Sequence, residues 1–204
     1  MANYRKLTLQ EVEILESQMC TASDWNLIEV SEDFSPKYVH HTRFSGNIRI
    51  GSFGKEFCLP GGMKKHSGLF YTTLHNVTIG DDCCIENVKN YIANYEIGHD
   101  TFIENVDIIL TDGLSTFGNG VEVMVLNETG GREVMIYDRL TAQTAYVMAL
   151  YRHRPEMIET LRAAIGRYVN GVASSKGYIG SYVTIVDAGY IKNVRVGDFC
   201  KIEG

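Results

Sequence analysis

The sequence predicts a mainly β protein built as a solenoid of short strands, with a helix near the N-terminus and an inserted helical hairpin. The first observation is a near repeat: IGDDCCIENV, which begins at Ile79, returns 18 residues later as IGHDTFIENV, which begins at Ile97. The second is a smaller period of six, because each copy has another isoleucine six residues on, at Ile85 and Ile103. A fixed period is typical of architectures in which each unit buries its apolar face against the next.

The spacing of the apolar residues favours strands over helices. An amphipathic helix repeats its apolar positions about every 3.6 residues, and these windows do not. A glycine follows the apolar residue, at Gly80 and Gly98, and we expect it to adopt a corner conformation that a side chain would crowd. Three of these six-residue units make one coil of 18 residues. The apolar position recurs with lower fidelity at Tyr38, Phe44, Ile50, Phe117, Val123, Ile179, Ile185, Ile191, Val196 and Ile202.

A helix is predicted at 8–19. Thr8 and Glu11 have the spacing of a capping box, which marks a helix N-terminus. Its apolar face contains Val12, Leu15 and Met19. We expect this helix to cover the first coil, whose open strand edges would otherwise pair with another chain.

Residues 138–170 break the period and have helical character. The glycine hexads vanish there, and apolar residues recur at helical spacing. Pro155 suits the first turn of a helix, and Gly171 suits the position just after a helix end. We therefore expect two helices, 138–152 and 155–170, that form a hairpin leaving the coils and returning to them.

The predicted organisation is a single domain over 1–204, with coils at 36–135 and 177–204. A shorter interruption at 59–76 contains the turn sequence PGG, and we expect a loop there that projects over a substrate. The last residues, VRVGDFCKIEG, stop inside a hexad. We therefore expect the chain to be the front part of a longer protein.

The composition narrows the class of function. A formal net charge of -6 argues against a nucleic-acid partner, because phosphate contacts need a basic face. The N-terminus lacks the apolar run of a signal peptide, and no segment has the length of a membrane helix, so we expect a cytoplasmic protein without a membrane partner. The five cysteines have no CxxC spacing, which favours reduced thiols.

The Ile-Gly hexads that begin at Ile79, Ile97 and Ile179, in coils of 18, resemble the left-handed parallel β-helix of the hexapeptide-repeat transferase superfamily. They also resemble an uncharacterised bacterial family of longer hexapeptide-repeat proteins. The resemblance implies a homotrimer that transfers an acyl group from a thioester to a sugar or nucleotide-sugar. It further implies acyl-CoA or acyl carrier protein as donor, no tightly bound cofactor, and a histidine as general base.

Three histidines are candidates for that base. His66 lies in the basic 59–76 loop, His75 lies where this loop rejoins the coils, and His99 follows a corner glycine. His99 also falls one coil above Asp81, so an Asp–His contact is geometrically possible. Each of the three also has a purely structural interpretation. The doublet His40 and His41 is expected to place one ring inside and one outside, because side chains alternate along a strand.

Candidate substrate-binding residues add charge to these histidines. Lys64 and Lys65 lie in the 59–76 loop, Asp81 lies at a corner, and Arg152 and Arg154 lie between the predicted helices. No metal site is predicted, because no spacing requires three converging histidines.

Two pairs of polar residues occupy equivalent repeat positions: Glu86 with Glu104, and Asn87 with Asn105. Adjacent carboxylates repel unless solvent, a proton or a cation intervenes, whereas asparagine amides can bond one another along a stack. A second hypothesis therefore stays open, in which the chain is a non-catalytic module that binds a sugar-nucleotide or acts as a scaffold. The two hypotheses differ in whether a candidate histidine lines a cleft with basic neighbours.

Overall fold

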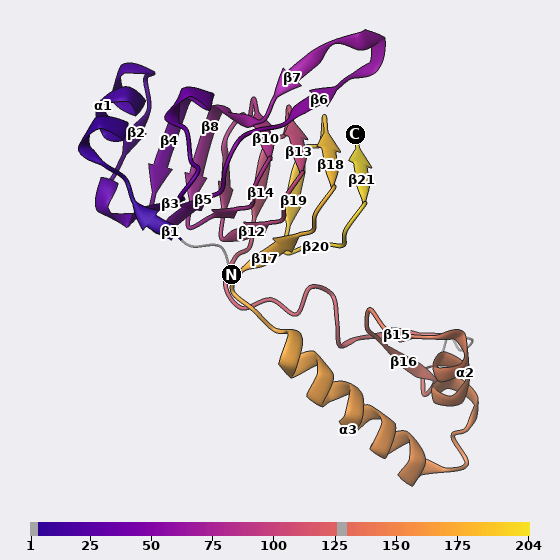
Figure 1. The fold of residues 1–204 in the computed structure, drawn as a ribbon. Coiled ribbons are helices and arrows are strands. Elements are labelled where there is room, and N and C mark those ends of the chain that lie inside the picture. Colours follow the sequence, from indigo (N-terminus) through magenta and orange to yellow (C-terminus); the bar gives the residue numbers. More distant parts are fainter. Residues whose placement is uncertain (1–3, 126–129) are drawn as a thin grey trace. The chain divides into compact units, whose positions relative to one another are not determined.

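The computed structural model of the protein describes residues 4–125 and 130–204 and shows a mainly β chain with three α-helices in these ranges (Figure 1). The chain divides into two compact units. The first unit comprises the residues up to Asp112 together with Lys176–Gly204, and the second comprises Gly113–Ser175. No helix in the described ranges has the length and apolar character needed to cross a membrane.

Two sheets of mostly parallel strands form the first unit. The seven-stranded sheet has the order β1 (Tyr4–Lys6), β3 (Ile28–Ser31), β5 (Ile48–Ile50), β9 (Thr78–Ile79), β12 (Tyr95–Ile97), β17 (Gly177–Ile179) and β20 (Arg195–Val196). The ten-stranded sheet contains β2 (Thr21–Ala22), β4 (Val39–Ser45), β8 (Gly68–His75), β10 (Cys84–Glu86), β11 (Tyr91–Ala93), β13 (Phe102–Glu104), β14 (Ile108–Leu110), β18 (Thr184–Val186), β19 (Tyr190–Lys192) and β21 (Lys201–Glu203). Only β1 pairs antiparallel in these two sheets, with β3.

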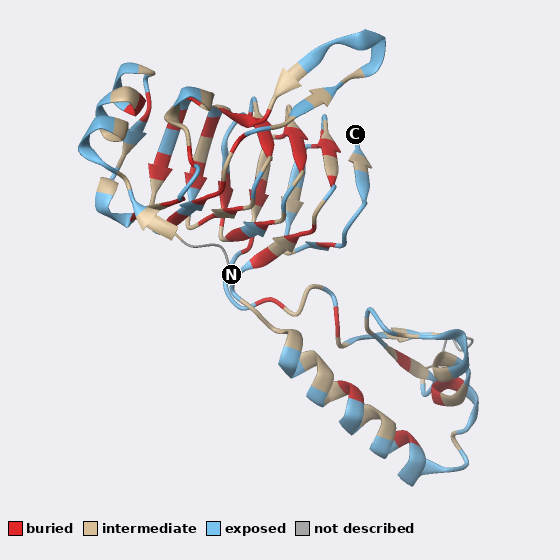
Figure 2. Cartoon of the chain, in the orientation of Figure 1, coloured by how far each residue is buried: buried red, intermediate tan, exposed pale blue. Residues whose placement is uncertain are grey.

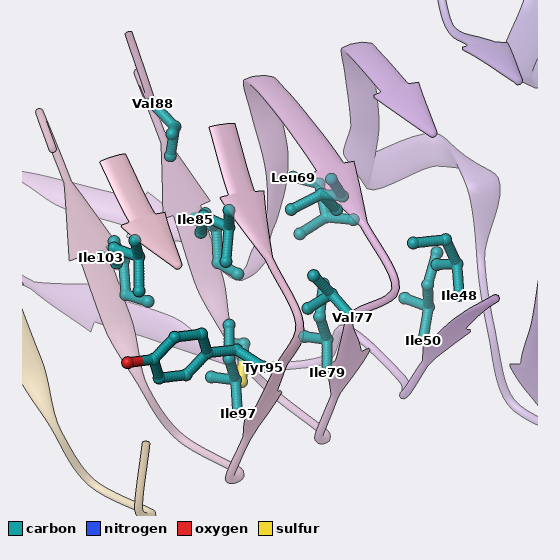
Figure 3. Packing of buried hydrophobic residues seen from close by; sticks show 14 of the residues in the cluster. Ile48, Ile50, Leu69, Val77, Ile79, Ile85, Val88, Tyr95, Ile97 and Ile103 are labelled. Atoms are coloured by element: carbon teal, nitrogen blue, oxygen red, sulfur yellow. The ribbon is translucent and has the colours of Figure 1, made fainter. Parts of the chain in front are cut away.

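The 18-residue repeat is confirmed as a pairing register. Ile79 lies opposite Ile97, and Ile85 lies opposite Ile103, so equivalent residues of successive repeats stand side by side. These side chains point into one interior between the sheets (Figure 3). They are fully or almost fully buried, and Figure 2 shows buried residues along the strands of both sheets. Period six therefore marks the residues that fill the core.

The repeated glycines have a different role from the one predicted. Gly80 and Gly98 do not adopt left-handed backbone angles; the left-handed residues lie two positions further on, at Asp82 and Asp100, each with φ 56°. A Cβ added to Gly80 would lie 2.7 Å from the backbone nitrogen of His99 in the next repeat. Glycine is required because neighbouring backbones approach closely, and aspartate tolerates the corner angle itself.

The N-terminal helix is α1 (Leu9–Ser17), slightly shorter than the predicted 8–19. Its capping box is confirmed: the Thr8 side chain accepts from Glu11 N, and the Glu11 carboxylate accepts from Thr8 N. Leu15 is buried in the core of the first unit. The helix lies beside β2 and β4, at the N-terminal end of the ten-stranded sheet, as predicted (Figure 1).

The second unit begins earlier than the predicted helical insertion. The strands β15 (Val121–Met124) and β16 (Glu133–Ile136) pair antiparallel and precede α2 (Ala142–Leu150) and α3 (Pro155–Val172). This unit has its own small core of Val134, Met148, Ala149 and Ile165.

The expected continuation of the coils to residue 135 is therefore corrected. Phe117 and Val123 match the period of six by position, but Val123 pairs with Val134 across a hairpin. A strand that pairs across a hairpin has the same local apolar character as a coil strand, so spacing alone could not separate them. The hairpin of helices begins at Ala142 rather than at 138, because the Thr141 side chain caps it by accepting from Thr144 N.

Candidate functional site

A β-hairpin projects from the first unit over the ten-stranded sheet (Figure 1). It consists of β6 (Glu56–Cys58) and β7 (Lys64–His66), joined by a turn in which Gly61 has φ 80° and Gly62 has φ 84°. The predicted loop at 59–76 is therefore corrected. Its second half is the sheet strand β8, because Leu69 and Leu74 are apolar residues of the core.

Lys65 of the hairpin joins the two stacked glutamates. Its Nζ lies 2.7 Å from a carboxylate oxygen of Glu86 and 2.7 Å from one of Glu104, which are opposite one another in register. The Lys65 side chain is 15% exposed and each glutamate side chain 24%. Burial opposes the lysine charge, but hydrogen bonds to Glu104 and Glu86 outweigh it and raise the pKa of Lys65. The repulsion expected between the glutamates is thus relieved by a cation.

A second ionic group lies beside the hairpin. Lys55 Nζ lies 2.5 Å from Asp100 Oδ1, and the other carboxylate oxygen of Asp100 lies 2.7 Å from His99 Nδ1. Burial alone would raise the pKa of Asp100, but hydrogen bonds from Lys55 and His99 lower it below its usual value. Because Asp100 engages Nδ1, the Nε2 atom of His99 is the nitrogen left for proton transfer.

Aromatic rings surround this ionic group. The His99 ring meets Tyr182 edge-on at 4.9 Å, and Tyr182 stacks parallel to Phe199, also at 4.9 Å. Lys55 Nζ lies 4.8 Å from the centre of the Phe57 ring. Phe199 is 76% exposed. The arrangement is therefore a histidine that contacts a carboxylate and lies next to an open aromatic pair, and we call these residues the His99 site.

The other two candidate histidines are engaged within the fold. The His66 ring stacks on Tyr38 at 3.7 Å, and its Nδ1 lies 2.8 Å from the carbonyl oxygen of Ser67. His75 Nδ1 lies 2.9 Å from Ser45 Oγ, and Nε2 lies 2.9 Å from the side-chain nitrogen of Asn76. The structure therefore does not bring His66 and His75 together with His99, and their catalytic roles stay predictions.

The suggested contact between Asp81 and His99 does not form. Asp81 Oδ1 accepts from Ser52 N at 2.8 Å and from Ser52 Oγ at 3.1 Å, and His99 pairs with the adjacent Asp100 instead. Asp81 thus accepts from a backbone N–H of the neighbouring segment, which needs an acceptor. Lys64 forms an exposed ion pair with Glu56 at 2.8 Å.

The expectation for the histidine doublet is also corrected. Neither ring is buried: His40 stacks on Phe70 and His41 stacks on Tyr71. His41 has φ 48°, so the regular alternation of the strand is interrupted at that residue. A left-handed residue turns its side chain outward where strand geometry would turn it inward.

The predicted amide ladder occurs at a different corner. Asn87 and Asn105 both have left-handed angles, but the Asn105 amide donates to Asp187. The bond between stacked amides runs from Asn76 Nδ2 to Asn94 Oδ1 at 3.2 Å.

Arg152 and Arg154 belong to the second unit. Arg152 Nη2 donates to the carbonyl oxygen of Glu133 at 2.8 Å, and Arg154 precedes α3 without a side-chain cap. A cavity of about 340 Å³ lies beside Arg152 and is also lined by Arg162, Glu159 and Ile158.

The cysteines are free thiols, in agreement with the sequence. Burial raises the pKa of Cys83 and that of Cys84 to about 12, which keeps both protonated. Within 4–125 and 130–204, no group of three histidine, cysteine or acidic side chains is placed to hold a metal ion.

The sequence marked His99 as a candidate but did not mark the residues that surround it. Lys55 lies 45 residues from Asp100, and nothing in its local pattern marks it. Tyr182 and Phe199 did carry a signal, because they occupy the same left-handed repeat position as Asp100, with φ 58° and 57°. Aromatic residues at a position otherwise filled by aspartate could have marked the site.

Comparison with known proteins gives a family and one curated relative. The family model described as "Domain of unknown function (DUF4954)" matches residues 4–204. An uncharacterized protein of Treponema pallidum (strain Nichols) is 24% identical to this chain in an alignment of length 204. The alignment covers 95% of this chain and 27% of that protein. The chain thus spans about a quarter of the relative's length. No solved structure matches.

This match corrects the resemblance drawn from the hexads. The family that covers the chain is DUF4954, and no hexapeptide-repeat family matches, whether the transferase superfamily or a longer bacterial family. Hexads report a local geometry of short strands and corners, which separate families can share, so they do not assign a superfamily.

Proposed function

The chain belongs to the DUF4954 family, and on that premise we propose that it transfers an acyl group from a thioester to a sugar or nucleotide-sugar, with His99 as general base. The observation that carries the proposal is the series of contacts from Lys55 through Asp100 to His99. Asp100 holds one ring nitrogen and stabilises the charged imidazolium, as the orienting carboxylate of an acid–base pair must.

The proposed reaction uses His99 Nε2 twice. The acceptor hydroxyl gives its proton to Nε2 while its oxygen attacks the thioester carbonyl carbon. The carbon–sulfur bond then breaks, and the leaving thiolate takes the proton back from the imidazolium. The aromatic pair of Tyr182 and Phe199 would stack against a sugar ring or a nucleobase and hold it beside the histidine.

The His99 site is open, and we propose that a homotrimer completes it with residues of a neighbouring subunit. The His99 side chain is 49% exposed, and acyl transfer needs a site from which water is excluded. Light scattering of the purified chain measures the subunit number. A monomer at micromolar concentration would remove this part of the proposal.

The experiment that tests the proposal measures free thiol released from acetyl-CoA and longer acyl-CoAs in the presence of nucleotide-sugars. We expect release to depend on the acceptor and to fall at least about a hundredfold in His99→Gln, which removes general-base catalysis. Asp100→Asn should lose activity with an altered pH profile. His153→Gln, in the second unit, is the control that keeps full activity. Acceptor-dependent release that persists in His99→Gln would refute the assignment of the base.

We also propose that the first unit is a left-handed parallel β-helix. Successive repeats contribute one strand to the seven-stranded sheet and two to the ten-stranded sheet, as in β9–β10–β11 and β12–β13–β14. Left-handed residues recur at equivalent corners, such as Asp82 and Asp100. A crystal structure with right-handed winding would refute this proposal.

A second function is a non-catalytic module that binds a sugar-nucleotide or serves as a scaffold. One observation favours it: Lys65, His66 and His75 are already engaged by groups of the same unit. Thermal shifts with nucleotide-sugars separate the two functions, because a ligand that binds only the native state raises Tm without any turnover. Binding without thiol release would select the module.

A further inference from the structure

On the solvent-facing side of the seven-stranded sheet, the strands β1, β3 and β5 carry charges of alternating sign. Lys6 of β1 lies in register with Glu29 of β3, and Glu29 lies in register with Arg49 of β5. The Glu29 carboxylate contacts Lys6 Nζ at 3.1 Å and Arg49 Nε at 2.9 Å. Two cations share one carboxylate, so this cluster keeps a positive charge.

A cavity of about 290 Å³ opens at the cluster. Its polar lining consists of Lys6, Glu29, Asn47, Arg49, Thr78 and Lys176. The lining residues come from segments that are distant in sequence but all belong to the first unit. The lining has three cations and one carboxylate, and the nearby Glu96 carboxylate offsets part of the charge of Lys176, so a local positive surplus remains in a chain whose formal net charge is -6.

Arg49 presents the donors best suited to an anion. Among the residues that the structure describes, the Arg49 side chain donates a hydrogen bond from Nε to the Glu29 carboxylate. This geometry leaves the two Nη groups for a ligand. The Tyr4 ring lies 5.6 Å from the guanidinium carbon and supports one face of the group. A guanidinium is a planar fork that binds phosphate or carboxylate oxygens in pairs.

Neutral donors and a more distant carboxylate complete the surroundings. Thr78 lies in register with Arg49 on the next strand, so its hydroxyl is on the same face of the sheet. The Glu96 carboxylate is 3.9 Å from Lys176 Nζ but does not line the cavity. The excess of cations is therefore greatest at Lys6 and Arg49.

We propose that this cavity binds the phosphoryl group of a small phosphorylated metabolite. A phosphoryl group carries a charge of about -1.5 to -2 at neutral pH, so the positive surplus at Lys6 and Arg49 attracts it. Its oxygens would take donors from Arg49 and Lys6 on one side and from Lys176 and Thr78 on the other. The cavity shares no residue with the His99 site, so the proposal stands or falls independently of acyl transfer.

The test is calorimetric titration of the full 204-residue chain with inorganic phosphate, pyrophosphate and acetate at low salt. We expect both phosphates to bind, acetate to bind more weakly, and added NaCl to weaken the binding. Arg49→Gln should weaken phosphate binding about tenfold or more, as expected for loss of charge-assisted hydrogen bonds. Lys201→Gln, which removes an exposed lysine of β21 that pairs with Glu203, should bind like the wild type.

Glu29→Gln gives a test of opposite sign. Glu29 competes with the ligand for Lys6 and Arg49, so its neutralisation should strengthen phosphate binding. Both Arg49→Gln and Glu29→Gln break the same ion pair, so damage to the fold would weaken binding in both. The proposal is overturned if the wild type binds neither phosphate at millimolar concentration. It is also overturned if both variants bind as the wild type does, or if acetate binds as tightly as phosphate.

Discussion

Replacement of Lys65 with methionine should destabilise the first unit. The variant removes the cation that lies 2.7 Å from both Glu86 and Glu104 and leaves two carboxylates on adjacent strands. Two like charges about 5 Å apart repel by roughly 3 kcal/mol at an effective dielectric constant of about 20. Solvent reaches a quarter of each glutamate side chain, and this exposure reduces the cost to about 2 kcal/mol.

Thermal unfolding followed by circular dichroism measures this loss. For a chain of this size, about 2 kcal/mol corresponds to a fall in Tm of roughly 4–8 °C. The matched control is Lys64→Met, its neighbour in the same strand, whose exposed pair with Glu56 should leave Tm unchanged.

A second substitution isolates the repulsion. Adding Glu104→Gln to Lys65→Met should recover stability, because only one of the facing carboxylates keeps its charge. Equal Tm values for Lys65→Met and the wild type would refute the reasoning. A double variant less stable than Lys65→Met would refute it as well.

Three further predictions concern backbone approach, pH and thiol chemistry. Gly98→Ala should lower stability by about 1–3 kcal/mol in chemical denaturation, because its Cβ would lie 2.6 Å from Ser181 Oγ, whereas Gly166→Ala, which meets nothing within 4 Å, should not. The hydrogen-bonded Arg5 guanidinium lowers the pKa of Glu11 to about 2, so this pair stabilises the fold above the ordinary carboxyl pKa near 4.5. That contribution should be lost as pH falls toward 2, and a pH series of unfolding midpoints should be flatter in Arg5→Gln; identical slopes would contradict the linkage. A thiol reagent at pH 8 should label Cys58 and Cys200 quickly and the three buried cysteines only on unfolding, and fast labelling of Cys83 would contradict its burial.

The core of the first unit could be predicted from sequence because its signal is periodic. Ile79 and Ile97 occupy one position in successive repeats, and at this position the apolar side chains fill the interior of the first unit. The same regularity correctly placed Glu86 beside Glu104. Local chemistry also predicted the start of the first helix, because a capping box is a contact between residues three apart.

The candidate sites depend on contacts that leave no periodic signal. Lys65 reaches the glutamates because a hairpin folds over the sheet, and Lys55 reaches Asp100 in the same way. The phosphoryl cavity joins four separate strands, and Lys6 and Lys176 become neighbours only after the sheet forms. The sequence predicts that the insertion begins at 138, whereas the second unit begins at Gly113. The difference arises because Val123 matches the period of six by position but pairs within a local hairpin.

The place where the second unit joins the stack has a consequence for evolution. The chain leaves the stack after Thr111, whose carbonyl oxygen accepts from the Asn94 amide, and re-enters at Gly177, whose N–H donates to the Asn94 carbonyl. Asn94 thus contacts both ends of the inserted segment. Ile97 pairs with Ile179 in the same register that joins the uninterrupted repeats. Because the entropy of closing a loop grows only slowly with its length, about 0.6 kcal/mol for each doubling, such a junction tolerates inserts of very different size. Natural variation can therefore lengthen, exchange or delete the inserted segment at this junction while the strands of the first unit keep their pairing.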